Sequence, residues 1–198
     1  MKMNIRYPKR KDSQQTFNHI ILTSKKLFAK NGFHSTSINE IIEKAKIATG
    51  TFYFYFKDKL TVYHYILDEY RHQIRQTIAQ AITTNMSRYE KEFHGLKAFL
   101  RYAWEDRLAY QIIWESMLID YDIFKSYYMS FSQDYMKQLE RSEDELNENI
   151  NLETLSFVLM GIANFVGLQV LFRDTCTEND LDQITNQVMR ILKEGIFK

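Results

Sequence analysis

Apolar residues recur every three or four positions along most of the 198-residue chain, which is the spacing of one face of an α-helix. The clearest stripe lies in residues 59–83, where Val62, Ile66 and Tyr70 follow one another at steps of four. Similar stripes predict helices at residues 16–31, 93–107, 108–118, 121–145, 152–172 and 178–194. The single proline, Pro8, precedes all of them. We therefore expect a nearly all-helical protein.

Residues 36–59, TSINEIIEKAKIATGTFYFYFKDK, predict two short helices around a tight turn. In the first, Ile38, Ile41 and Ala45 share one face. Thr36 or Ser37 would cap its start. Residues 46–48 form the turn, and the second helix opens near Thr49. This layout is that of a helix-turn-helix, in which the first residues of the second helix reach base edges in the major groove.

A strand is the alternative for the run TFYFYF, because its three phenylalanines occupy alternate positions. A strand needs a partner that satisfies its backbone groups. We find no second run of alternating β-branched residues in the sequence, which favours the helix.

About 45 residues carry a resemblance to a known family. They comprise the helix with Leu27, Phe28 and Gly32, then T-S-I, then G-T-F-Y-F-Y-F-K-D-K. The pattern resembles the TetR family of bacterial transcription regulators. The resemblance implies nine DNA-contacting residues, which are Thr36 and Ser37 near phosphates, Asn39, Thr49, Gly50 and Thr51 nearest base edges, and Tyr53, Tyr55 and Lys59 on the DNA backbone. Lys46 stands where the family usually has a turn glycine, and Ala48 replaces the usual serine cap. Each departure costs about 1 kcal/mol.

The periodicity and the resemblance together predict an all-α fold with two domains. Residues 1–60 would form a three-helix helix-turn-helix DNA-binding domain, with a basic arm at 1–13. A long helix would join it to residues 61–198, a helical bundle for ligand binding and dimerisation. That helix would act as the lever between ligand and DNA.

The net charge of the chain changes sign at the same boundary, near residue 60. Residues 1–60 hold 12 Lys and Arg against 4 Asp and Glu, a net charge of +8, whereas the remainder holds 14 against 21, a net of −7. A basic N-terminal part suits a partner rich in phosphates, although a solvated basic face gives the same count. The basic run Lys9–Lys11 would lie along phosphates or enter a minor groove; a disordered tail without a specific role is the alternative.

The middle of the chain is rich in aromatic and methionine side chains, and the resemblance implies a ligand cavity there. Packing alone is the competing explanation. The candidate lining residues are Trp104, Trp114, Met117, Tyr121, Tyr128, Phe131 and Phe165. Such a lining suits a small, largely apolar or aromatic effector, which tyrosine hydroxyls would orient.

The last two predicted helices each present an apolar face. The residues concerned are Leu155, Val158, Leu159, Ile162, Ala163, Val166 and Val170 on one, and Leu181, Ile184, Val188, Ile191 and Leu192 on the other. The resemblance implies that both helices pair with those of a second copy in a homodimer. An internal core is the alternative.

Other chemistry finds little support in the sequence. The carboxylates Glu115, Asp120 and Asp122 have no histidine at metal-ligand spacing, so we interpret them as surface groups and expect no metal, no cofactor and no enzymatic activity. One cysteine, Cys176, excludes an internal disulfide. We find no apolar run of about 20 residues and no N-terminal signal core, which predicts a cytoplasmic protein.

The resulting hypothesis is a DNA-binding transcriptional regulator. In this hypothesis a homodimer represses transcription at a palindromic operator until a small apolar effector releases it, and repression is implied by the resemblance. The alternatives are a DNA-bound scaffold of the same fold that contacts another protein without an effector, and a small helical enzyme.

Overall fold

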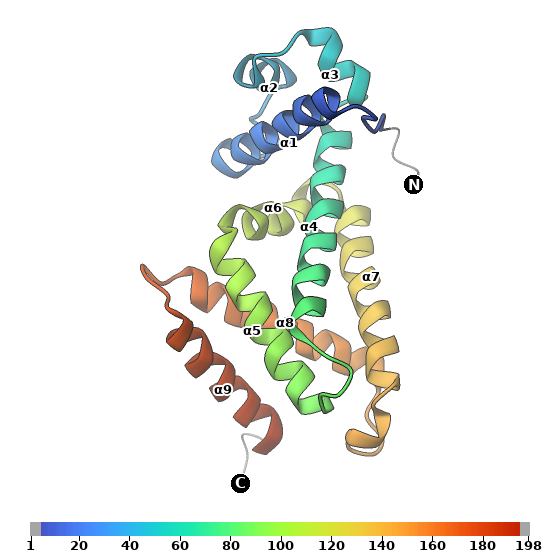
Figure 1. Cartoon of the computed structure of the whole chain (residues 1–198), viewed down its shortest axis with the longest axis vertical. Coiled ribbons are helices and arrows are strands. Elements are labelled where there is room, and N and C mark those ends of the chain that lie inside the picture. Colours follow the sequence, from blue (N-terminus) through green and yellow to red (C-terminus); the bar gives the residue numbers. More distant parts are fainter. Residues whose placement is uncertain (1–4, 195–198) are drawn as a thin grey trace. The chain divides into compact units, whose positions relative to one another are not determined.

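The computed structural model describes residues 5–194, in which the chain forms nine α-helices and one short 3₁₀-helix (Figure 1). The helices are α1 (Lys11–Asn31), α2 (Ile38–Ala45), α3 (Thr49–Tyr55), α4 (Lys59–Ala81), α5 (Arg88–Glu105), α6 (Arg107–Ile119), α7 (Tyr121–Glu140), η1 (Glu143–Glu145), α8 (Leu152–Leu171) and α9 (Glu178–Glu194). The predicted all-α fold is confirmed.

The chain divides into two compact units. The first comprises residues 1–71 and 108–127, and the second comprises residues 72–107 and 128–198. The first unit therefore extends beyond residue 60 and takes in the first half of α4, nearly all of α6 and the start of α7. Helix α4 is continuous through both units.

Aromatic side chains form the core of the first unit. The ring of Phe17 on α1 stacks on Phe56 at a centroid distance of 5.0 Å and meets Tyr55 edge-on at 5.4 Å. It also meets Tyr65 of α4 at 5.1 Å. One side chain of α1 thus packs against the end of α3 and the side of α4, which ties the three helices together.

Helix α1 begins at Lys11, five residues before the predicted start at residue 16. The apolar stripe starts only at Phe17, so periodicity could not reveal the first, solvent-facing turn. Asp12 in that turn suits the positive end of the helix dipole. At the other end Gly32 takes a φ of 80°, which suits glycine, and its amide donates to Phe28 O, so this residue ends the helix.

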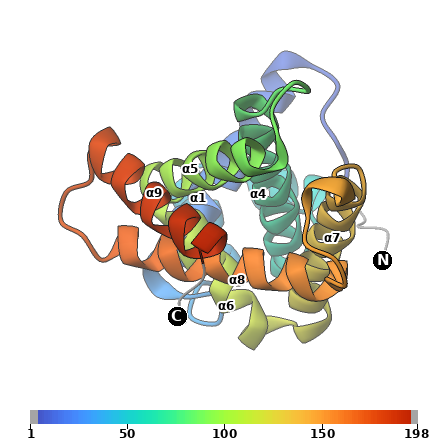
Figure 2. The ribbon, with the colours of Figure 1, turned by 90° about the horizontal axis from the view of Figure 1, so that it is seen from below.

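In the second unit α5 packs against both α8 and α9 (Figure 2). Leu100 of α5, Val170 of α8 and Leu181 of α9 form the centre of this contact. Helix α5 begins at Arg88, ahead of the predicted residue 93, because Ser87 and Glu90 form a capping box upstream of the apolar stripe.

Helix α8 corrects one expectation. The helix has 20 residues, and the mean hydropathy of its most apolar 18-residue window is 1.8, so it is long and apolar enough to cross a membrane by length and composition alone. The expectation of no such run was therefore wrong. A single helix of this kind is weak evidence for a membrane span, and α8 packs against α5 within the second unit. Only 22% of its most apolar window is buried within the chain, so much of this helix offers an apolar surface.

His64 on α4 gives the first unit a predicted pH dependence. Its Nε2 lies 3.8 Å from Asp120 Oδ2. Burial lowers the pKa of His64 below 6.5, although Asp120 and Asp58 oppose this effect. The unfolded chain therefore binds a proton that the folded chain does not, and stability falls as the pH drops below about 6.5.

We expect His64→Asn to reduce the loss of Tm between pH 7.5 and pH 5.5, measured by circular dichroism. The matched control is His19→Asn on the exposed side of α1, which is expected to keep the wild-type dependence on pH. Parallel Tm curves for wild type and His64→Asn would contradict this assignment.

Candidate nucleic-acid interface

Helix α3 presents two different faces. Phe52 and Tyr55 are buried, as is Phe56 directly after the helix. These positions follow helical spacing, so the strand alternative for TFYFYF is wrong. Thr49 and Gly50 are exposed, and Tyr53 is 53% exposed. The N-terminal end of α3 is thus open to solvent while the other face anchors it to the core.

The turn before α3 has the unusual features that the sequence predicts. Lys46 lies in the left-handed region, with φ 51° and ψ 47°, and its amide donates to Glu43 O. Ala48 occupies the position before α3 without a side-chain cap. The turn is therefore formed without the usual glycine and serine.

Helix α2 is capped as predicted by Ser37, whose Oγ accepts a hydrogen bond from Glu40 N at 3.1 Å. The Glu40 carboxylate accepts a bond from Asn31 Nδ2, also at 3.1 Å. Asn39 lies on the exposed side of α2. Of the four residues predicted nearest base edges, Asn39, Thr49 and Gly50 are exposed and Thr51 is half-buried.

Two residues predicted to contact DNA have buried side chains whose hydroxyls bond to backbone carbonyls of the same unit. Thr36 is 1% exposed, and its hydroxyl donates to Gly32 O at 2.9 Å and lies 3.3 Å from Leu27 O. The buried Tyr55 donates its hydroxyl to Ser13 O at 3.2 Å. Both hydroxyls stabilise the domain because they satisfy backbone carbonyls, and neither side chain is placed to reach a phosphate.

Lys59 also points inward. Its ammonium lies 2.6 Å from both Phe33 O and Thr36 O, and 4.3 Å from the centroid of the Phe33 ring. Burial lowers the pKa of Lys59, and the nearby Glu115 carboxylate opposes that effect. The amine therefore holds the loop between α1 and α2, and a contact with DNA phosphate would compete with these carbonyls.

Glu115 on α6 is a residue that sequence reasoning missed. Its Oε1 accepts a hydrogen bond from Phe33 N at 2.7 Å. The interpretation as a surface carboxylate was wrong, because the group is half-buried and bonded to backbone. The partner is an amide 82 positions away in the chain, so no local pattern marks it.

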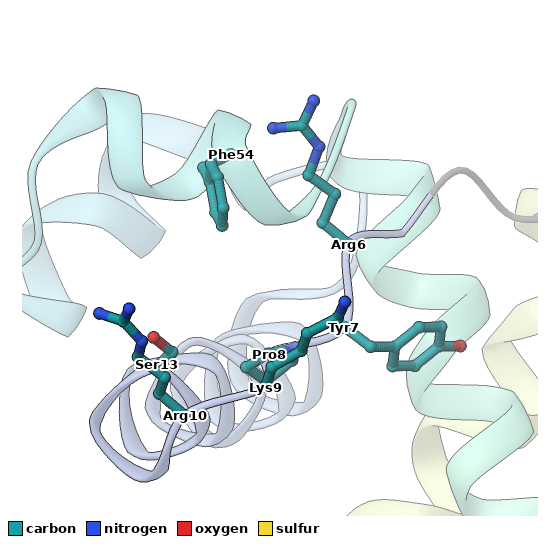
Figure 3. A pocket seen from close by; sticks show the side chains of 7 residues that line it. All are labelled: Arg6, Tyr7, Pro8, Lys9, Arg10, Ser13 and Phe54. Atoms are coloured by element: carbon teal, nitrogen blue, oxygen red, sulfur yellow. The ribbon is translucent and has the colours of Figure 1, made fainter.

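The basic arm forms backbone contacts with the C-terminal end of α3. Ile5 forms an antiparallel bridge with Phe56, and Arg6 N donates to Tyr55 O at 3.3 Å. The Arg6 guanidinium lies 5.1 Å from the centroid of the Phe54 ring. A hollow of about 470 Å³ opens here (Figure 3); its lining residues are Arg6, Tyr7, Pro8, Lys9, Arg10, Ser13 and Phe54.

The arm residues 5–10 therefore lie beside α3 and do not extend away from it. Lys2 of the predicted arm is outside the described residues. Three cations, Arg6, Lys9 and Arg10, thus line the hollow beside Phe54 of α3.

The predicted ligand-lining residues fall into both units. Trp114, Met117 and Tyr121 belong to the first unit, and the other four belong to the second. A pocket lined by all seven is thus not a feature of either unit alone. Met117, Tyr121 and Phe165 are more than half exposed.

Two of the remaining candidates have contacts of their own in the second unit. Trp104 packs against the core around Leu100, and the Arg75 guanidinium lies 4.7 Å from the ring centroid of Phe131. Burial raises the pKa of Tyr128 to about 12. Among residues 5–194 we find no group of three or more His, Cys, Asp or Glu side chains placed to hold a metal ion.

Comparison with known proteins agrees with this geometry. Residues 20–66 match the family described as bacterial regulatory proteins, tetR family. A solved structure from Syntrophomonas wolfei, assigned provisionally as a TetR-family transcriptional regulator, superimposes with a TM-score of 0.78 over 93% of this chain and 97% of that one, at 19% identity. Residues 20–66 and the fold of the chain thus both match the TetR family.

Two further proteins are similar to this chain, one in fold and one in sequence. The fatty acid degradation regulator FadR from Bacillus halodurans superimposes with a TM-score of 0.73 over 96% of this chain and 98% of its own, at 16% identity. The uncharacterized HTH-type transcriptional regulator YuxN from Bacillus subtilis is 26% identical over 152 residues, or 75% of this chain. That match spans 45% of YuxN, less than half its length. All three relatives are described as regulators, which are not an enzyme class.

We expect Lys59→Met to destabilise the DNA-binding unit by about 1–3 kcal/mol, because two buried carbonyls lose a charged donor while the aliphatic stem is kept. Urea unfolding followed by circular dichroism would measure the change. Lys57→Met removes an exposed lysine two residues away and is the matched control, with an expected change within about 0.5 kcal/mol. Equal effects of the two substitutions would exclude this role for Lys59.

Proposed function

We propose that this TetR-family regulator binds a palindromic operator as a homodimer and represses transcription until a small apolar effector releases it. The observation that carries the DNA-binding part is the exposed N-terminal end of α3, with Thr49, Gly50 and Tyr53 on the surface beside the basic arm. Gly50 has open space where a Cβ would lie, so the helix can approach the floor of a groove closely.

In this proposal α3 enters the major groove and α2 lies across its edge. Asn39, Thr49, Gly50 and Thr51 reach toward base edges, while Ser37 and Tyr53 contact phosphates. Arg6, Lys9 and Arg10 add cations beside α3. Thr36, Tyr55 and Lys59 act indirectly, because their polar groups hold the backbone that presents the reading residues.

The proposed homodimer uses α8 and α9. Val158 and Phe157 on α8 and Ile191 and Leu192 on α9 are all more than a third exposed. Burial of apolar side chains against a second copy would remove this surface from water. A two-fold axis would place the two α3 helices about 34–36 Å apart, one turn of DNA, which explains why the operator should be palindromic.

Effector control follows from differential binding. A ligand releases DNA only if it prefers the conformation with the wrong spacing between the two α3 helices. To shift the protein from mostly DNA-bound to mostly DNA-free, the effector must bind the released conformation more tightly by about 5.5 kcal/mol. Because α4 is continuous through both units, it is the element that would carry the change. Fatty acids are the first compounds to test, since FadR of Bacillus halodurans is named as a regulator of fatty acid degradation.

A DNA-bound scaffold without an effector remains the second candidate, favoured by the net charge of −7 beyond residue 60, which suits a protein partner. Both functions place the protein in the cytoplasm. Thermal shift against fatty acids and aromatic compounds separates them, because stabilisation that accompanies release of DNA is expected only for the effector-controlled regulator.

The DNA-binding proposal is tested first by selecting bound fragments from the source genome and measuring their affinity by fluorescence anisotropy. We expect Tyr53→Ala and Arg6→Ala each to weaken operator binding about three- to tenfold. Arg6→Ala should also lower the slope of log K against log salt by about 1 for each phosphate that the variant no longer neutralises, whereas Tyr53→Ala should leave the slope unchanged.

Lys30→Ala is the matched control for charge, since Lys30 is an exposed cation in the last turn of α1. It is expected to leave both the affinity and the salt slope within error of wild type. Wild-type affinity for Tyr53→Ala and Arg6→Ala together would argue against α3 and the arm as the DNA-binding surface.

For the dimer we expect Val158→Glu to convert the protein to a monomer in sedimentation velocity, because a carboxylate would be buried without a partner. Val158 is 48% exposed and Leu22 on α1 is 49% exposed. Leu22→Glu is therefore the matched control and should stay dimeric. A dimer that persists in Val158→Glu would place the interface elsewhere.

A further inference from the structure

The loop between α1 and α2 is held by side chains from two distant parts of the first unit. Lys59 at the start of α4 donates to Phe33 O and Thr36 O, both at 2.6 Å. Glu115 on α6 accepts from Phe33 N at 2.7 Å. A cation and a carboxylate thus bind opposite ends of the same residue, Phe33. Hydrogen bonds to charged groups are stronger than those between neutral ones.

The loop is shaped to admit the carboxylate. Gly32 has a φ of 80°, and a Cβ built on it would lie 3.0 Å from Glu115 Oε1. Any side chain at this position would therefore be strained and would also crowd the carboxylate. The glycine that ends α1 provides the space through which α6 reaches the loop.

Helix α6 has a second attachment to this unit. The hydroxyl of Tyr63 on α4 donates to Ile112 O on α6. The Tyr63 ring also contacts the ring of Phe33, with centroids 5.1 Å apart. Burial and the Glu115 charge both raise the pKa of Tyr63, which keeps the hydroxyl protonated and able to donate. The two attachments fix α6 against both α4 and the loop.

The bond between Glu115 and Phe33 lies close in sequence to the residues proposed to read DNA. Phe33 lies four residues before Ser37, whose side chain caps α2. At its N-terminal end, α6 is joined to α5 by a single residue, Asp106. A displacement of α6 along its axis would therefore move the amide that precedes α2, and it would do so through a bond and not only through packing.

We propose that Glu115 is the positioning residue through which α6 sets the loop at 32–37 and so the α2–α3 reading helices for DNA binding. The inference rests on the proposed DNA-binding function. Because an ordered loop presents α2 and α3 without an entropic cost at the moment of binding, loss of the bond weakens the affinity for DNA.

The test compares Glu115→Ala and Glu115→Gln in the full-length protein by hydrogen exchange and by anisotropy with the selected operator. Glu115→Ala is expected to speed exchange in peptides covering residues 32–37 about tenfold and to weaken operator affinity about fivefold. Glu115→Gln keeps an oxygen acceptor and should recover part of both effects. Gln111→Ala, an exposed position on the same helix, is the control and should change neither.

Each outcome bears on a distinct claim. Faster exchange at 32–37 with wild-type operator affinity would overturn the positioning role, as would unchanged exchange in both Glu115 variants. If Glu115→Ala fails to fold, the Glu115→Gln variant gives the same two readouts. A wild-type protein that selects no DNA from the genome would instead overturn the proposed function, and the inference with it.

Discussion

Packing of one face of α3 against the aromatic core is the constraint on which the rest of the DNA-binding unit depends. A helix of seven residues is too short to be stable alone in water. Burial of Phe52, Tyr55 and Phe56 supplies the missing stability. The rings of Tyr55 and Phe56 contact Phe17 of α1, and Phe56 also contacts Tyr65 of α4. Because these buried residues fix the rotation of α3, the exposed residues Thr49, Gly50 and Tyr53 must face outward.

Some polar groups near this helix are bonded to the backbone of the unit, and others are exposed to solvent. The hydroxyls of Thr36 and Tyr55 and the ammonium of Lys59 satisfy backbone carbonyls, which would otherwise be costly to bury. They keep the loop and the start of α1 in place. The side chains that remain exposed are thus left to contact a partner, and the rigidity of the inner set makes their positions reproducible.

The sequence could predict the helices well because their stripes are long and their breaks are clear. It missed the first turns of α1 and α5, where residues 11–15 and 88–92 lie outside the apolar stripes and caps set the start. It predicted helix α3 but not the direction in which Thr36, Tyr55 and Lys59 point, since family position does not report burial. The structural role of Glu115 could not be predicted, because its partner is a backbone amide brought near only by the fold.

Lys46 shows how one residue can serve two opposed demands. Its left-handed backbone suits glycine better than lysine, and its exposed side chain adds a positive charge at the tip between α2 and α3. A glycine there would relax the turn and remove an exposed cation from the unit. In the proposed DNA-binding mode, a gain in stability at this position therefore comes with weaker attraction to DNA.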